Sequence, residues 1–160
     1  MLSRHRRFAT RTVLALMLLA CGSLAYADSA WDGSWQLNLA KSKFDPGPPF
    51  KSQTRTIKTE GDKQTQTVET VDADGKSTRS RSTYGIDGKD YPITGSAEFE
   101  SVAAKKVDES TIDATLKRAG KEVGTANRKL SKDKKTMTVT TKGTNRDGQA
   151  MSNVLVFDRQ

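Results

Sequence analysis

After residue 28 the chain consists of short segments in which apolar and polar residues alternate, separated by turn residues at intervals of about 8 to 12 positions. In the first segment, Trp35, Leu37 and Leu39 share one face. A period of two is the pattern of a β-strand with one buried face, and the abundant threonine favours strands. The segments predicted as strands are 34–39, 53–60, 65–71, 77–84, 90–94, 99–107, 111–118, 122–130, 137–141 and 151–157.

Tight turns join these segments directly. Asp-Gly pairs stand at three of the turns, at 74–75, 87–88 and 147–148, where positive φ angles are tolerated. No stretch between the strands has a helical stripe, so consecutive hairpins form an antiparallel meander. Closing a meander into a barrel removes its free edges. The sequence therefore predicts one all-β domain over residues 28–160, an antiparallel up-and-down barrel of about ten strands, with a β-sandwich as the alternative.

Residues 1–27 have the three-part layout of a secretory signal peptide. Four arginines and no acidic residue precede an apolar run at 13–20, and the small residues Ala25 and Ala27 mark a cleavage site. The run is shorter than the ~20 residues of a membrane-spanning helix, so we expect no transmembrane segment. Cleavage after Ala27 predicts a protein of the periplasm or the cell exterior.

Cys21 gives the same leader a second interpretation. Residues 18–22 resemble a bacterial lipobox, in which the cysteine is lipidated and becomes the first residue of the mature protein. The second position of this motif holds a leucine instead of the usual small residue. A form anchored to the envelope through Cys21 is therefore the alternative to cleavage after Ala27.

The composition of the mature part limits its chemistry. The whole chain carries a net charge of +8, and removing a leader with four basic residues and no acidic ones leaves +4, a mixed surface that favours solubility. His5 and Cys21 both lie in the leader, so the domain has no imidazole base, no thiol nucleophile and no ordinary zinc ligands. We expect a monomer that is not an enzyme, with no cofactor, no metal and no nucleic-acid partner.

Two pairs of acidic residues are the nearest approach to a catalytic site. Glu98 with Glu100, and Asp72 with Asp74, are spaced so that each pair shares a strand face. A glycosidase needs one such carboxyl group in an apolar setting, which neither pair has. A calcium loop of the EF-hand type fails too, because the twelfth residue from Asp72 is a threonine. A carboxylate-based hydrolase remains the enzymatic alternative.

Basic residues follow neighbouring predicted strands. Arg55 and Lys58 lie on one of them, and Arg79 and Arg81 on another. Binding of single-stranded nucleic acid would require aromatic side chains for stacking beside them, and only Tyr84 is near. We therefore interpret this stripe as a charged outer face of the barrel.

The apolar residues on the inward parity are the candidates for ligand contact. In a wide barrel they would line a cavity, and in a narrow barrel they would fill it, and the sequence leaves both possibilities open. The candidate cavity-lining residues are Trp35, Leu37, Ile57, Val68, Tyr84, Tyr91, Phe99, Leu116, Met137, Val139, Leu155 and Phe157.

The two ends of the domain resemble those of lipocalins and fatty-acid-binding proteins, the calycin barrels. GSWQL at 33–37, followed by KFD at 43–45, is similar to their opening strand, whose Gly-x-Trp plugs one end of the barrel. VLVFDR at 154–159 resembles the last strand of the fatty-acid-binding branch. The resemblance implies a ligand-binding barrel with Trp35 as the plug.

The chain departs from the fatty-acid carriers at two places. The carriers have two short helices between their first two strands, whereas residues 40–52 are proline-rich without a helical pattern. The carriers hold a ligand carboxylate with an Arg-x-Tyr pair on the last strand, and the matching positions here are Leu155 and Phe157. Neither side chain can bind an anion, so the resemblance supplies no carboxylate anchor.

A resemblance that spans nearly the whole domain is to small exported bacterial proteins to which no activity is assigned. It covers residues 35–44, 87–92 and 153–157. We expect an exported, non-catalytic protein that holds a small hydrophobic or amphiphilic molecule in the barrel. The alternative is a packed barrel that acts through its surface, as a structural or interaction protein of the envelope.

Overall fold

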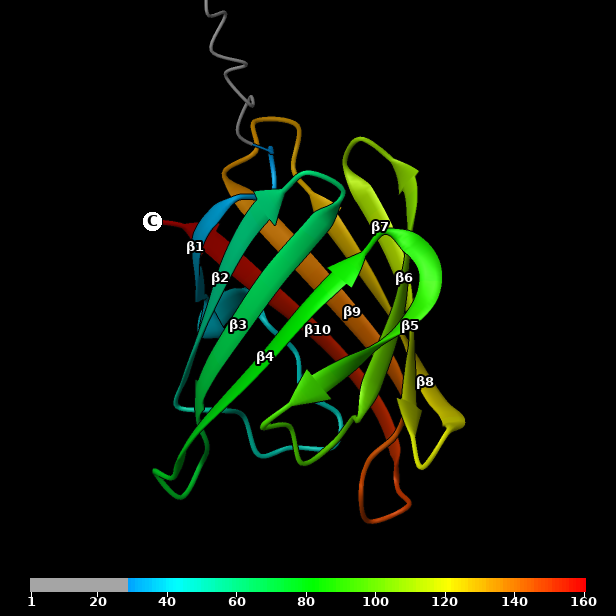
Figure 1. The fold of residues 1–160 in the computed structure, drawn as a ribbon. Helices are drawn as coiled ribbons and strands as arrows, with labels where there is room; N and C mark the ends of the chain where they lie inside the picture. The colour runs from blue at the N-terminus through cyan, green and yellow to red at the C-terminus, as the bar shows by residue number, and fades with distance from the viewer. Residues whose placement is uncertain (1–28) are drawn as a thin grey trace, which may run out of the picture.

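The computed structural model describes residues 29–160, which form a closed antiparallel barrel (Figure 1). The signal peptide, cleavage after Ala27 and lipidation of Cys21 lie outside these residues. The strands are β1 Gly33–Leu37, β2 Ser52–Glu60, β3 Lys63–Val71, β4 Ser77–Gly85, β5 Asp87–Thr94, β6 Ser101–Asp108, β7 Thr111–Arg118, β8 Lys121–Leu130, β9 Thr136–Thr144 and β10 Ala150–Arg159, with a 3-10 turn, η1, at Leu39–Lys41.

The strands follow one another around the barrel in chain order, and β1 closes the ring between β2 and β10. Trp35 on β1 lies opposite Arg55 on one side and Arg159 on the other. The predicted fold class is thus confirmed, and the sandwich alternative is wrong. Within the described chain no helix has the length and apolar character to cross a membrane.

Two local predictions from the sequence are wrong. Leu39 does not continue the first strand, because the Asn38 side chain accepts a hydrogen bond from the Lys41 N–H at 3.2 Å and starts η1 there. Leu39 is consequently 43% exposed. The pair Asp87–Gly88 is not a turn between strands but lies inside β5, where a shift in register marks a β-bulge.

One end of the barrel is closed by two tryptophans and an arginine. Trp35 is fully buried, and its indole N–H donates to the carbonyl of Trp31 at 3.0 Å. The Arg159 guanidinium lies 4.1 Å from the centre of the Trp35 ring and donates to the carbonyls of Ala30 and Asp32. The position of Trp35 agrees with the plug that the resemblance implies.

The opposite end is covered by loops instead of helices (Figure 1). Residues 42–51 connect η1 to β2 without a helix, as the sequence predicts, and Phe44 packs edge-on against Phe50 with 5.3 Å between ring centres. Phe50 reaches the interior. This end is therefore the one at which the barrel interior meets irregular chain.

The loop between β5 and β6, residues 95–100, covers part of the same end. Arg118 donates from Nε to the Glu98 carbonyl at 2.8 Å and from its terminal nitrogens to the carbonyls of Thr144 and Asn145. The Glu98 carboxylate accepts the Arg146 N–H at 3.0 Å. Arg118 thus joins three neighbouring turns into one cover.

Candidate ligand-binding cavity

A cavity of about 360 Å³ lies inside the barrel and extends to the loop-covered end. Protein pockets for small ligands typically measure about 300 to 1,000 Å³. The interior is therefore not a filled core, and of the two possibilities left open by the sequence the structure shows the lined cavity. The volume suits one small molecule.

The twelve candidate residues divide evenly between the cavity and the packed core around it. Tyr91 is half-buried, and its hydroxyl donates to Asp87 at 3.1 Å. The residues that line the cavity are Val68, Tyr84, Phe99, Leu116, Val139 and Leu155. Those that pack without lining it are Trp35, Leu37, Ile57, Tyr91, Met137 and Phe157.

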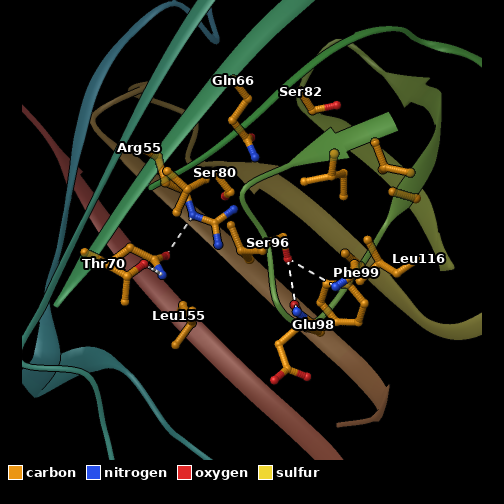
Figure 2. Close-up of a pocket in the computed structure, with 18 of the residues that line it drawn as sticks. Arg55, Gln66, Thr70, Ser80, Ser82, Ser96, Glu98, Phe99, Leu116 and Leu155 are labelled. Atoms are coloured by element: carbon orange, nitrogen blue, oxygen red, sulfur yellow. Dashed lines mark hydrogen bonds between the residues drawn. The ribbon is translucent and has the colours of Figure 1, made fainter. Parts of the chain in front are cut away.

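Arg55 points into the barrel from β2 (Figure 2). Its Nε donates to Gln53 Oε1 at 3.0 Å, and its guanidinium lies 4.9 Å from the centre of the Phe157 ring. The two terminal nitrogens make no hydrogen bond within residues 29–160. Because Arg55 is only half-buried although it lies in the interior, its accessible surface faces the cavity.

Arg128 enters the same interior from β8, and it is almost fully engaged. One terminal nitrogen donates to Gln66 Oε1 at 2.8 Å and to the Tyr84 hydroxyl at 3.0 Å, and the other donates to Gln64 Oε1 at 2.7 Å. The guanidinium lies 4.7 Å from the centre of the Trp31 ring. Only its buried Nε has no partner among the described residues. Arg128 is therefore held near the closed end of the barrel.

The two guanidinium groups make the interior positively charged. Burial, and secondly the positive charge of Arg128, lower the pKa of Arg55 from 12.5 to about 10, while Tyr84 acts in the opposite direction. No carboxylate is among the groups that act on this pKa. Residues 29–160 contain no cluster of His, Cys, Asp or Glu that could hold a metal ion. An anion in the cavity would be attracted to Arg55.

The sequence interpretation of Arg55 as part of an outer basic stripe is wrong. Successive residues of a strand face opposite sides, so Gln53, Arg55 and Ile57 must share a face, and Ile57 belongs to the core. The parity of β2 could therefore have placed Arg55 inside. The same signal was available for Arg128, which lies two residues before the buried Leu130 and therefore shares its face of β8.

The acidic pairs are engaged in holding loops. Glu98 forms an ion pair with Arg118 at 3.5 Å, and Glu100 accepts the Ala119 N–H at 2.8 Å. Asp72 accepts the backbone N–H groups of the hairpin turn that follows it, at 2.9 and 3.0 Å. The carboxylates of Glu98, Glu100 and Asp72 therefore stabilise loops and turns.

Leu155 and Phe157 occupy the positions where the resemblance would place a carboxylate anchor. Leu155 lines the cavity with an apolar side chain, and Phe157 is fully buried. The ring of Phe157 supports the Arg55 guanidinium. The unpaired guanidinium group that faces this cavity therefore comes from β2, and the last strand offers no cationic side chain at these two positions.

No protein-family profile matches the chain, and no curated protein sequence does. The fold is similar to that of zebrafish ileal bile acid-binding protein, solved in complex with cholic acid, with a TM-score of 0.54 and 14% sequence identity. The likeness covers 82% of this chain and 100% of that one. At this identity the likeness shows the fold alone: a closed ten-stranded antiparallel barrel, similar to that of the zebrafish protein.

Proposed function

We propose that this protein is a non-catalytic binding protein that holds one small amphiphilic molecule in its barrel, with an anionic head group on Arg55. The observation that carries the proposal is a guanidinium group inside the barrel whose two terminal nitrogens face a cavity and have no partner in residues 29–160. An unpaired charge in such a place is costly. A bound carboxylate, sulfonate or phosphate would satisfy it.

The rest of the cavity suits the apolar part of such a molecule. Ile112, Leu116, Val139 and Leu155 line it, so that an inserted apolar group would exchange contact with water for contact with these side chains. Burial of apolar surface contributes about 25 cal/mol per Å². A charge-assisted hydrogen bond adds about 1.5 to 3 kcal/mol, so the head group would orient the ligand as well as strengthen its binding.

The similar zebrafish protein supports a ligand of this kind, because it was solved with cholic acid, which is itself an amphiphile with one carboxyl group. A binding role without catalysis agrees with the contacts of the acidic residues. Glu98 and Asp72 border the cavity, but both carboxylates, like that of Glu100, bind loop or turn groups in the described part of the chain.

Export forms part of the proposal. The signal-peptide pattern of residues 1–27 supports a periplasmic or extracellular protein cleaved after Ala27. Intact-mass measurement of protein recovered from the native envelope tests this directly. A mass that begins at Asp28 is expected, whereas a diacylated or triacylated Cys21 as the first residue would replace the soluble form with an anchored one.

A pair of nearly isosteric fluorescent probes tests the head-group site. 8-Anilinonaphthalene-1-sulfonate carries a sulfonate, and N-phenyl-1-naphthylamine has the same rings without it. We expect Arg55→Met to weaken binding of the sulfonate at least about tenfold, which corresponds to the loss of a charge-assisted hydrogen bond, and to leave the neutral probe within about twofold. Titrations of probe fluorescence measure both affinities.

Arg79→Met is the matched control, because Arg79 is an exposed arginine of β4 that pairs with Glu69 on the outer surface. It removes the same charge and should change neither affinity. If neither probe binds the unmodified protein, the carrier role is wrong. If both arginine variants weaken the sulfonate equally, the effect is one of net charge and Arg55 is not the anchor.

A further inference from the structure

The two sides of the cavity differ in chemistry. Strands β2, β3 and β4 contribute Arg55, a set of amide and hydroxyl side chains and one aliphatic residue, Val68, whereas strands β5, β6 and β7 contribute only apolar side chains. The polar members beside Arg55 are Gln53, Gln66, Thr70, Thr78, Ser80 and Ser82. The interior is therefore divided lengthwise, with a polar wall facing an apolar wall.

Part of the polar wall has unused hydrogen-bonding capacity. Gln53 and Thr70 bond each other at 2.9 Å, and Ser82 donates to the Pro92 carbonyl at 2.9 Å. By contrast, the hydroxyls of Thr78 and Ser80 make no side-chain hydrogen bond within residues 29–160. Polar groups that a ligand covers without bonding lose their contact with water at a cost. A ligand that fits this wall must offer partners along its length.

The side chains at the centre of the apolar wall are short. Ala104 lies opposite Ala114, and Ala114 lies opposite Ala126, so three alanines form one row across β6, β7 and β8. All three line the cavity. Ile112 and Leu116 stand on either side of Ala114 on the same face of β7. The row is a flat shelf with raised borders, which a planar ring face can cover more completely than a single flexible chain.

We infer that the ligand is a rigid, ring-containing anion with its polar substituents along one face, and not a straight-chain fatty acid. The inference rests on the proposed function, and it adds the shape of the molecule to the charge of its head group. The polar face would meet Thr78 and Ser80, the apolar face would lie on the alanine row, and the anion would meet Arg55. A straight alkyl chain would place methylene groups against the hydroxyl wall.

Competition against bound 8-anilinonaphthalene-1-sulfonate tests the inference with three carboxylates. Cholate has a fused-ring skeleton with hydroxyl groups on one face, lithocholate has the same skeleton with a single hydroxyl, and laurate is a straight chain. We expect cholate to displace the probe at a concentration at least about tenfold lower than laurate, and lower than lithocholate.

Removal of the hydroxyl wall should erase this preference selectively. The double variant Thr78→Val with Ser80→Ala should raise the half-displacing concentration of cholate by about threefold or more and leave that of laurate within about twofold. The matched control is Thr65→Val with Thr83→Val, which removes two hydroxyls that bond each other at 2.9 Å on the outer face of β3 and β4. This control should change neither ligand.

A variant on the opposite wall supplies an independent readout. Ala114→Leu fills the shelf and should weaken cholate about tenfold, and laurate less, because a flexible chain can bend past the added side chain. Far-UV circular dichroism establishes that each variant retains its strands. Laurate binding as tightly as cholate, or equal losses for both ligands in both cavity variants, overturns the inference and leaves the carrier role intact. Failure of the unmodified protein to bind the sulfonate probe removes the carrier role itself.

Discussion

Arg55 is the residue on which the proposed binding chemistry depends, and its burial destabilises the unliganded protein. The fall of its pKa from 12.5 to about 10 corresponds to an unfavourable contribution on the order of 3 kcal/mol. Its contacts with Gln53 and Phe157 offset about 1 to 2 kcal/mol of this destabilisation. Because the destabilisation from burying the charge exceeds the stabilisation from these contacts, the unliganded barrel should be more stable without this charge.

We therefore expect Arg55→Met to raise the free energy of unfolding by about 1 kcal/mol at neutral pH while it weakens anion binding. The pKa of Arg55 is lower in the folded state, so the cost is fully present in the unmodified protein below pH 10. It declines as the pH rises through about 10, where the folded state loses the proton first. Urea unfolding of both proteins between pH 8 and 11 should show the gap narrowing at the alkaline end.

Arg79→Met again provides the comparison, because its exposed ion pair with Glu69 contributes little. Its unfolding midpoint should match that of the unmodified protein across the same pH range. A less stable Arg55→Met variant would show that the guanidinium is a structural group, in contradiction to its assignment as a binding group.

At the scale of elements, the β5–β6 loop depends on one glycine. Strands β4 and β5 pair at only two positions, and Gly95 follows directly with a φ of +74°. A Cβ atom at Gly95 would lie 2.2 Å from the carbonyl oxygen of Arg79, closer than any real contact. The close approach of the loop to β4 therefore requires glycine in both conformation and space.

We expect Gly95→Ala to destabilise the protein by at least about 2 kcal/mol, because the left-handed conformation and the overlap act together. Gly88→Ala isolates the first effect, since Gly88 has a similar φ of +79° but open space at the Cβ position. That variant should cost about 1 kcal/mol. Urea unfolding compares the two, and equal costs would mean that the loop moves freely away from β4.

The strands themselves were predictable from the sequence because alternation is a local pattern. Each of the ten predicted segments overlaps a strand, and the errors lie where a side chain overrides the pattern, as Asn38 does by starting η1 at Leu39. The Asp87–Gly88 pair looked like a turn, but the same dipeptide can also form a bulge inside a strand.

At the scale of the whole molecule, the sequence predicted the barrel and the apolar part of the candidate site, but it did not predict the charged part. Apolar candidates such as Leu116 and Val139 line the cavity as expected. The charged half was missed because Arg55 was assigned to the surface by residue type, although strand parity placed it beside Ile57. The volume of the cavity depends on small residues such as Ala114 meeting across strands, and pairing of this kind cannot be seen in one linear sequence.

The pairing of β1 with β10 makes the cylinder a late product of folding. These two strands lie at opposite ends of the described chain, so β1 cannot pair with β10 until β10 has been synthesised. A nascent polypeptide can form hairpins along the way, but it can neither enclose an interior nor complete the contact of Arg159 with Trp35. A chain that enters a narrow export channel before its tenth strand is made would therefore have no finished barrel to unfold, and its interior cavity would form only on the far side.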